Sequence, residues 1–202
     1  RAAMDALAPI TDDFEIILVN DASTDKTPQL IDALCAKDPR VKAVHNPKNL
    51  KLGGTLRAGY AVATRELVLY TDADLPFDLH EVRRAVRLLE VQKADVVSAY
   101  RFDRTSEGLL RTVYSFFYNS LVRALFGLAI KDVNFSFKLF RRELLSKFTL
   151  KSDGSFIDVE FLCRARKAGA HIIQIGVDYF PRSRGVSTLS SPAVIVKILR
   201  EL

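Results

Sequence analysis

The sequence predicts a single α/β domain built on a mostly parallel sheet, and three observations support this fold class. Apolar runs of strand length alternate with stretches of helix length through the first half of the chain, a pattern typical of strand–helix–strand units. The run Leu67–Tyr70 is apolar at every position, as expected for a strand buried on both faces. The chain of 202 residues contains no low-complexity linker, and this length suits one domain with a substantial core.

The first half contains four predicted strands, which are Glu15–Asn20, Val41–His45, Leu67–Tyr70 and Ala94–Ala99. The predicted helices between them are Thr27–Ala36, Thr55–Thr64 and Leu79–Gln92. Asn46–Gly54 is rich in Asn, Pro, Lys and Gly, which predicts a loop. Arg1–Leu7 resembles the middle or end of a helix with no strand before it. We therefore expect that an N-terminal strand is missing from this sequence.

The second half changes character after Arg101. The predicted elements there are a long helix at Leu109–Phe126, a strand at Asn134–Phe140, a helix at Phe156–Ala168, two short strands at His171–Ile175 and Val177–Phe180 split by Gly176, a basic loop at Pro181–Leu189 and a helix at Pro192–Leu202. The long helix is crowded with aromatic residues, which favours a place in the core. This crowding also suits a groove for a lipid chain or a face lying on a membrane.

Asp72 and Asp74 follow the apolar strand directly and precede Pro76. Open α/β sheets bind ligands at the carboxyl ends of their strands. Two carboxylates at such an end can converge on Mg²⁺ or Mn²⁺, which prefer oxygen ligands and are usually shared with substrate phosphates. The alternative is a solvated turn, because Asp is common where strands end.

Other polar residues also lie at predicted element ends. Asp21 follows a buried strand and could accept hydrogen bonds from a base or ribose, or it could cap the next helix. Gly53 and Gly54 could let backbone amides approach a phosphate, or they could form an ordinary turn before a helix. Asp158 and Glu160 lie near a helix start, where carboxylates favour the helix dipole.

The composition favours certain classes of binding partner but does not identify one. The net charge of +6 favours anionic partners such as phosphates, nucleic acid or an acidic membrane surface. Four arginines lie at element ends or in loops, and they are Arg101, Arg111, Arg182 and Arg184. Each could bind a phosphate through two parallel hydrogen bonds, and the alternative is that they form a solvated basic face. The two cysteines lie in predicted helices, which fits a reducing compartment. We find no apolar run long enough to span a membrane.

Taken together, the motifs resemble glycosyltransferase family 2, which has the GT-A fold. The matching stretches are VNDASTDKT at Val19–Thr27, the glycine-containing Asn49–Ala63, TDADLP at Thr71–Pro76, NFSFKLFRRELL at Asn134–Leu145 and the segment Phe156–Leu189. Within the family the sequence is most similar to dolichol-phosphate mannosyltransferases and bacterial polyprenyl-phosphate glycosyltransferases. The resemblance implies one domain over residues 1–202, with a nucleotide-sugar half at about 1–100 and an acceptor half at about 101–202.

The resemblance also implies roles for matched residues. Asp21, Asp72 and Asp74 are expected to bind the nucleotide-sugar, with Asp72 and Asp74 holding Mg²⁺ or Mn²⁺. The expected acceptor-phosphate ligands are Arg101, Arg111, Ser115, Arg182 and Arg184. Asp74 and Asp158 are the expected catalytic residues, with Asp158 as the general base for a hydroxyl acceptor.

We therefore expect an inverting transfer from a UDP- or GDP-sugar to a polyprenyl or dolichyl phosphate, without a nucleic-acid partner. The enzyme is expected at the cytoplasmic face of a membrane, in peripheral contact with it. One alternative is a family 2 transferase that uses a sugar hydroxyl acceptor. The other is a catalytically silent module that binds nucleotides or membranes.

Overall fold

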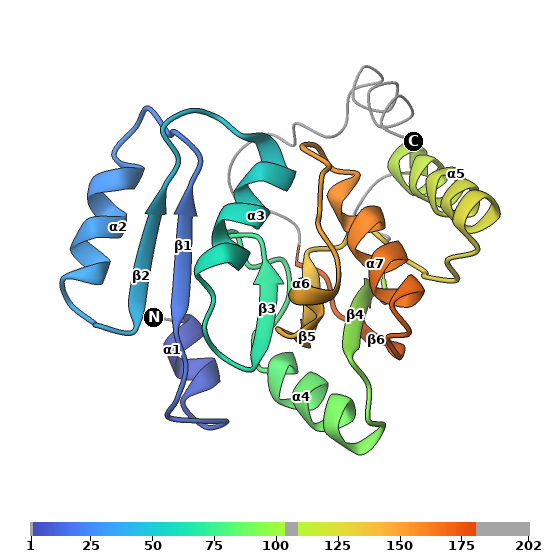
Figure 1. Cartoon of the computed structure of the whole chain (residues 1–202), viewed down its shortest axis with the longest axis horizontal. Coiled ribbons are helices and arrows are strands. Elements are labelled where there is room, and N and C mark those ends of the chain that lie inside the picture. The colour runs from blue at the N-terminus through green and yellow to red at the C-terminus, as the bar shows by residue number, and fades with distance from the viewer. Residues whose placement is uncertain (1, 104–108, 181–202) are drawn as a thin grey trace.

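The computed structural model describes residues 2–103 and 109–180, without the side chains at 109–111 and 114. In chain order the elements are α1 (Ala2–Leu7), β1 (Ile16–Asn20), α2 (Thr27–Cys35), β2 (Val41–His45), α3 (Lys51–Val62), β3 (Leu67–Thr71), α4 (Glu81–Val91), β4 (Val96–Arg101), α5 (Leu109–Phe126), β5 (Phe137–Arg141), α6 (Leu144–Lys147), α7 (Ile157–Lys167) and β6 (Ile172–Val177) (Figure 1). The predicted order of strands and helices is confirmed in this part of the chain, except that α6 was not predicted and that the two short strands predicted around Gly176 form one strand, β6. The predicted loop at Pro181–Leu189 and helix at Pro192–Leu202 lie outside the described residues.

The strands form two sheets. β1 pairs with β2 in parallel, and the second sheet has the order β3-β5-β4-β6. In this second sheet β4 and β6 are parallel, and β5 runs antiparallel to both β3 and β4. β3, β4 and β6 therefore point the same way, and β5 alone is reversed. Their carboxyl ends meet at one edge, where the sequence places its candidate carboxylates.

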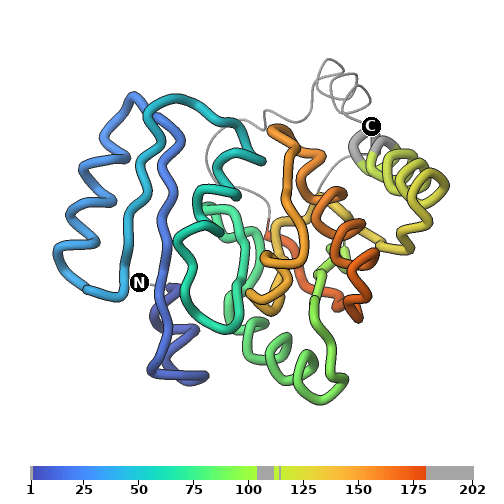
Figure 2. Tube along the Cα trace, in the orientation of Figure 1, coloured from blue at the N-terminus to red at the C-terminus, as the bar shows by residue number. Residues whose placement is uncertain are grey.

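Helices cover both faces of the sheets, as a three-layer α/β architecture requires. α2 packs against β1 and β2, and α3 packs against β1. α4 covers β4, β5 and β6, and α1 lies beside it (Figure 2). Val97 packs in the core on the α4 side, whereas the adjacent Val96 packs in the core on the α7 side. This alternation follows from the two-residue period of a strand.

Three glycines lie in elements that the sequence did not predict for them. α3 begins at Lys51 rather than Thr55, so Gly53 and Gly54 are helical. A Cβ atom at Gly53 would lie 2.0 Å from the backbone oxygen of Ser152, so the glycine permits close packing of the helix on another segment. The predicted break at Gly176 is wrong, because β6 continues through it. A Cβ there would meet side chains at 3.2 Å, so this glycine also serves packing.

The aromatic helix α5 is only partly a core helix. Val122 is fully buried, but Phe116 and Phe117 are 67% and 65% exposed. The expectation that its aromatic residues pack inside is therefore wrong for this face. No helix among the described residues combines the length and apolar character needed to cross a membrane.

Candidate active site

The turn after β3 carries the two predicted metal-binding carboxylates. The Leu75 amide donates a hydrogen bond to the Asp72 carbonyl oxygen at 3.2 Å, which closes a tight turn over residues 72–75. Leu75 has φ +49, in the left-handed region that such turns use. Asp72 is half-buried and Asp74 is exposed. The structure therefore places both carboxylates at the carboxyl edge of the sheet, as predicted from the sequence.

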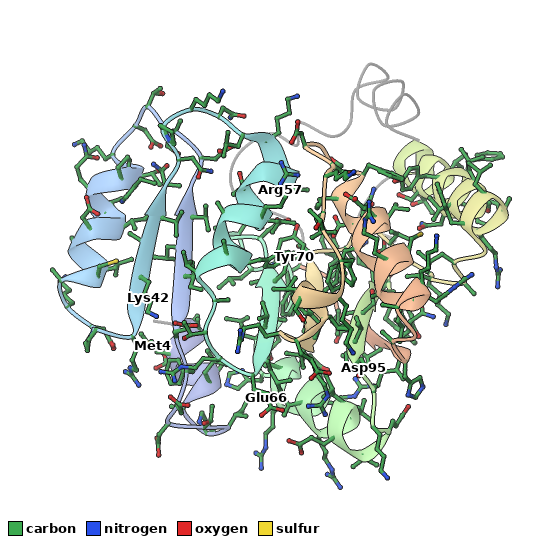
Figure 3. The ribbon with its side chains drawn as sticks, in the orientation of Figure 1. Met4, Lys42, Arg57, Glu66, Tyr70 and Asp95 are labelled. Atoms are coloured by element: carbon green, nitrogen blue, oxygen red, sulfur yellow. The ribbon has the colours of Figure 1, made fainter. Side chains whose placement is uncertain are left out.

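Tyr70 lies in β3 beneath this turn and is buried in the centre of the molecule (Figure 3). Burial raises the pKa of Tyr70 well above its ordinary value, and the charges of Asp158 and Asp72 add to this effect. A hydrogen bond between the Tyr70 and Asp72 side chains raises the pKa of Tyr70 further. Because the phenol keeps its proton, it can donate to the Asp72 carboxylate and orient it.

A buried ion pair lies next to Tyr70. The Nζ atom of Lys138 is 2.8 Å from Oδ1 of Asp158, and the two side chains are 1% and 3% exposed. Lys138 faces Tyr70 across the β3–β5 ladder, and its Nζ also donates to the Phe135 carbonyl oxygen at 2.7 Å. Burial raises the pKa of Asp158, although the ammonium of Lys138 opposes this effect. The nearby charge of Asp72 also raises the pKa of Asp158, so the pair is electrostatically linked to the candidate metal site.

Arg101 lies at the end of β4 and forms a forked ion pair. Its Nε donates to Oδ2 of Asp132 at 2.7 Å, and its Nη2 donates to Oδ1 at 2.9 Å. The guanidinium also lies over the rings of Phe135 and Tyr179, at 5.7 and 5.4 Å from their centroids. These contacts fix its position at the same edge of the sheet as the β3 turn.

The other predicted acceptor ligands are less fully described. Ser115 is half-buried on α5. The backbone of Arg111 lies in the same helix, but its side chain is outside the described residues. Arg182 and Arg184 also lie outside the described residues, so their predicted contact with phosphate stays a prediction.

Asp21 joins the end of β1 to the start of α3. Its Oδ1 accepts hydrogen bonds from the Leu50 amide at 2.8 Å and from Nδ2 of Asn46 at 2.9 Å. Burial alone would raise the pKa of Asp21, but these hydrogen bonds lower it below the ordinary value. The predicted alternative was a cap on the next helix, α2, whereas these contacts hold the loop that leads into α3. Contact with a nucleotide base stays a prediction.

Glu160 supports the segment that packs against α3. Its carboxylate accepts hydrogen bonds from the Lys151 amide at 3.0 Å and the Ser152 amide at 2.8 Å. Nε of Arg164 donates to the same carboxylate at 2.7 Å. Arg57 lies on α3 (Figure 3), and its Nη2 lies 2.6 Å from Oδ1 of Asp153. Glu160 therefore holds the 151–153 segment in place, which is a structural role.

The chemistry of the β3 turn fits a hard divalent cation. No cluster of three or more His, Cys, Asp or Glu side chains suited to a metal occurs among the described residues. Mg²⁺ and Mn²⁺ sites in nucleotide enzymes commonly use only one or two carboxylates, because substrate phosphates supply the other oxygens. Asp72 and Asp74 provide such a pair at a solvent-accessible turn.

Lys138, Asp132 and Tyr70 are not among the site residues that the sequence predicts. Lys138 interrupts the apolar run Phe137–Phe140 in a predicted strand. A lysine in a strand of this kind is rarely buried unless it is paired, so the pattern itself signals a buried carboxylate partner. The identity of that partner depends on which helix packs over β5.

Comparison with known proteins agrees with the fold and the motifs. Residues 1–149 match the family model described as glycosyl transferase family 2. Glycosyltransferase AglD of Haloferax volcanii is 31% identical over 176 residues, which cover 85% of this chain and 28% of that protein. Polyprenol monophosphomannose synthase of Mycolicibacterium smegmatis is 29% identical over 188 residues, with 87% of this chain and 70% of that protein covered. The chain thus spans under a third of the archaeal relative's length.

The structure of glucosyl-3-phosphoglycerate synthase from Mycobacterium tuberculosis, in complex with phosphoglyceric acid, superposes with a TM-score of 0.72. It is 19% identical, and the alignment covers 98% of this chain and 71% of that chain. At this identity the likeness concerns the fold, and it confirms the predicted GT-A architecture. The chain carries a glycosyltransferase domain and belongs to glycosyl transferase family 2, close to the polyprenyl-phosphate glycosyltransferases.

Proposed function

We propose that this domain transfers a sugar from a UDP- or GDP-linked donor to a polyprenyl or dolichyl phosphate, with inversion at the anomeric carbon. The observation that carries the proposal is the pair of carboxylates, Asp72 and Asp74, at the carboxyl edge of the sheet that also positions Arg101. Relatives named as a polyprenol monophosphomannose synthase and an undecaprenyl-phosphate mannosyltransferase support the same acceptor class.

On the donor side, Asp72 and Asp74 would hold Mg²⁺ or Mn²⁺ together with the donor diphosphate. Such a cation, when bound, neutralises the charge that develops on the departing diphosphate. Tyr70 orients the Asp72 carboxylate from below, as its hydrogen bond indicates. Asp21 would contact the base from the end of β1.

On the acceptor side, Arg101, Arg111 and Ser115 would hold the lipid phosphate in line with the anomeric carbon. Arg182 and Arg184 would contact phosphate from the segment that follows β6. A phosphate monoester is largely ionised near pH 7, because its second pKa is about 6. It therefore requires little general-base assistance.

The burial of Asp158 supports a phosphate acceptor over a hydroxyl acceptor. A general base must come within hydrogen-bonding reach of the hydroxyl proton that it removes. The Asp158 carboxylate is 3% exposed and is ion-paired with Lys138. We infer that Asp158 influences the site indirectly, through its ion pair with Lys138 and its electrostatic interaction with Asp72. A transferase with a hydroxyl acceptor is therefore the second candidate.

The exposed side chains of helix α5 support peripheral contact with a membrane. If the donor is a cytosolic nucleotide-sugar, this contact would be with the cytoplasmic face of the membrane. The exposed face of α5 carries Val113, Phe116, Phe117 and Leu125. Apolar side chains exposed along one face of a helix fit the boundary between headgroups and acyl chains. The net charge of +6 adds electrostatic attraction to anionic lipids.

Calorimetry with UDP and GDP, with and without Mn²⁺, tests the donor site. We expect one nucleotide to bind in a metal-dependent way, and Asp74→Asn to abolish this binding. Asp78→Asn is the matched control, because Asp78 is an exposed carboxylate a few residues downstream. Binding that survives in Asp74→Asn, or that needs no metal, would contradict the donor-site proposal and favour the silent module.

Turnover assays then identify the acceptor. A detergent-solubilised polyprenyl phosphate is compared with the unphosphorylated polyprenol and with a free sugar. We expect product only with the phosphate. Transfer to the sugar hydroxyl, without a requirement for the lipid phosphate, would instead establish the second candidate.

A further inference from the structure

Asn20 and His45 are the last residues of β1 and β2, and they are paired at the end of the parallel ladder (Figure 1). Asn20 is buried, with 5% exposure, whereas His45 lies at the surface. Nδ2 of Asn20 lies 3.2 Å from Nδ1 of His45. The residue that follows Asn20 is Asp21, which the proposed function places against the nucleotide base. The pair therefore lies directly next to the proposed base contact.

The Asn20 side chain holds the turn that contains Asp21. Its Oδ1 accepts a hydrogen bond from the Ser23 amide at 3.1 Å, which closes the turn over residues 20–23. Ala22 lies inside this turn with φ +57, in the left-handed region that residues other than glycine adopt only at a cost in free energy. The bond from Ser23 opposes relaxation of Ala22, so the conformation of the turn depends on how the Asn20 amide group is oriented.

The orientation of the Asn20 amide group is set by His45. Because Oδ1 of Asn20 accepts from the Ser23 amide, the group that faces His45 is the Nδ2 donor. Nδ1 of His45 is then the acceptor, and the neutral ring carries its proton on Nε2. Nε2 lies 3.0 Å from Oδ1 of Asp32 on α2, to which it donates. A chain of directed hydrogen bonds therefore runs from α2 through His45 and Asn20 to the turn.

The two partners of the His45 ring differ in their exposure to water. The Asp32 side chain is 67% exposed, and an exposed pair of this kind contributes little because water competes for both groups. Asn20 is buried, and a buried donor that loses its partner retains the full cost of desolvation. The bond between His45 and Asn20 is therefore the one that fixes the turn, and Asp32 orients the ring.

The ends of the two strands are also joined by contacts that do not involve the His45 ring. The Asn46 amide donates to the Asn20 carbonyl oxygen at 2.9 Å, and Nδ2 of Asn46 donates to Oδ1 of Asp21 at 2.9 Å. These bonds remain when the His45 side chain is changed. Loss of the ring should therefore disturb the turn over residues 20–23 while the ladder between β1 and β2 stays intact.

We propose that His45 is a positioning residue for nucleotide binding, because through Asn20 it holds the turn that presents Asp21 to the base. The His45 ring acts through Asn20 and does not itself contact the ligand. The proposal rests on the proposed function, since it requires that Asp21 lies at the nucleotide. His45 lies outside every motif that carries the family resemblance, so the sequence alone does not mark it.

Two substitutions at His45 separate its two hydrogen bonds. An asparagine places its side-chain oxygen near the position of Nδ1, whereas a glutamine reaches the position of Nε2. His45→Asn therefore retains an acceptor for Asn20, and His45→Gln retains only the contact with Asp32. In calorimetry with Mn²⁺ and the nucleotide that the wild type binds, we expect His45→Gln and His45→Leu to bind about 10-fold more weakly, as the loss of one hydrogen bond predicts. His45→Asn should bind within about threefold of the wild type.

Exchange of the Ser23 amide hydrogen with solvent gives a second measurement, which needs no nucleotide. We expect this exchange to be about 10-fold faster in His45→Gln and His45→Leu, and close to the wild-type rate in His45→Asn. His171→Leu is the matched control, because His171 is an exposed histidine that directly precedes β6. It should change neither the affinity for nucleotide nor the exchange of Ser23.

Equal nucleotide affinity in His45→Asn and His45→Gln would overturn the proposal, because the bond to Asn20 would then not be what binding requires. Slow exchange of Ser23 in His45→Gln would overturn it as well, since the turn would be held without His45. A wild type that binds neither UDP nor GDP would overturn the proposed function and, with it, the role of His45 in binding. The exchange rates would still show in that case whether His45 holds the turn.

Discussion

Lys138 and Asp158 form an ion pair in the interior of the domain, with 2.8 Å between Nζ and Oδ1. Lys138 belongs to β5 and Asp158 to the first turn of α7, so the pair ties a central strand to the helix that covers it. Such buried pairs add little net stability over an apolar core of the same volume, but breaking one is costly. The pair is therefore better explained by its place beside Tyr70 and Asp72 than by stability.

Lys138→Met should lower the free energy of unfolding by about 3–5 kcal/mol, because it leaves the Asp158 carboxylate buried without its cation. Lys138→Met/Asp158→Leu removes both charges and should recover most of this loss. Denaturant titration near pH 7 measures both variants. In the single variant the loss should shrink as the pH falls, because Asp158 then takes up a proton.

If the pair only supported the fold, the double variant would recover nucleotide binding along with stability. We expect instead that it unfolds like the wild type but binds nucleotide and Mn²⁺ more weakly, because Asp72 has lost the charges that position it. Full recovery of metal-dependent binding would contradict the positioning role.

Gly53→Ala should destabilise the domain by about 1–3 kcal/mol or more, as overpacking does. The new Cβ would lie 2.0 Å from the Ser152 carbonyl oxygen, a backbone atom that cannot rotate away. Gly59→Ala in the same helix is the matched control, since its Cβ would meet only a methyl group of Val19 at 3.0 Å. Thermal unfolding compares the two variants. Equal changes in stability would show that helix propensity, rather than packing against Ser152, causes the effect of Gly53→Ala.

Substitutions at Asp21 separate its structural contacts from a role in binding. Asp21→Ala should cost about 1–3 kcal/mol, because the Leu50 amide and the Asn46 side chain lose their acceptor. Asp21→Asn retains an oxygen that can accept both bonds, so stability should change much less. If Asp21 also contacts the base, Asn should still weaken nucleotide binding by calorimetry; unchanged affinity would confine Asp21 to its structural role.

Glu15 should make stability sensitive to acid. Burial alone would raise its pKa, but hydrogen bonds from Lys42 and from the amide and hydroxyl of Thr64 lower the pKa of Glu15 from 4.5 to about 2. Because the folded state holds the ionised form, the unfolded state binds the proton first, and this stability is lost as the pH falls from about 4.5 to about 2.

Glu15→Gln should therefore cost about 1–3 kcal/mol near neutral pH and flatten the unfolding free energy across that acid range. Asp12→Asn, at an exposed position in the same segment, should leave the profile unchanged. Denaturant titrations at several pH values measure this. An unaltered profile in Glu15→Gln would assign the acid sensitivity to other carboxylates.

Apart from α6 and the continuity of β6, the order of strands and helices could be predicted from the sequence, as could the placement of Asp72 and Asp74 at the end of β3. These features depend on local periodicity and on residues that follow one another in the chain. The family could be recognised for the same reason, because its motifs are short and contiguous. The boundary of α3 could not be predicted, since Gly53 and Gly54 read locally as a loop and are helical because of what packs against them.

Only the tertiary structure decided which charges meet. The register of β5 sets Lys138 opposite Tyr70, and the packing of α7 brings Asp158 to it. The fork between Arg101 and Asp132 joins two segments in the same way. A sequence shows that a buried lysine needs a partner, because an unpaired charge in the core is too costly. The sequence does not show which carboxylate pairs with the lysine, because that depends on how elements distant in the chain pack together.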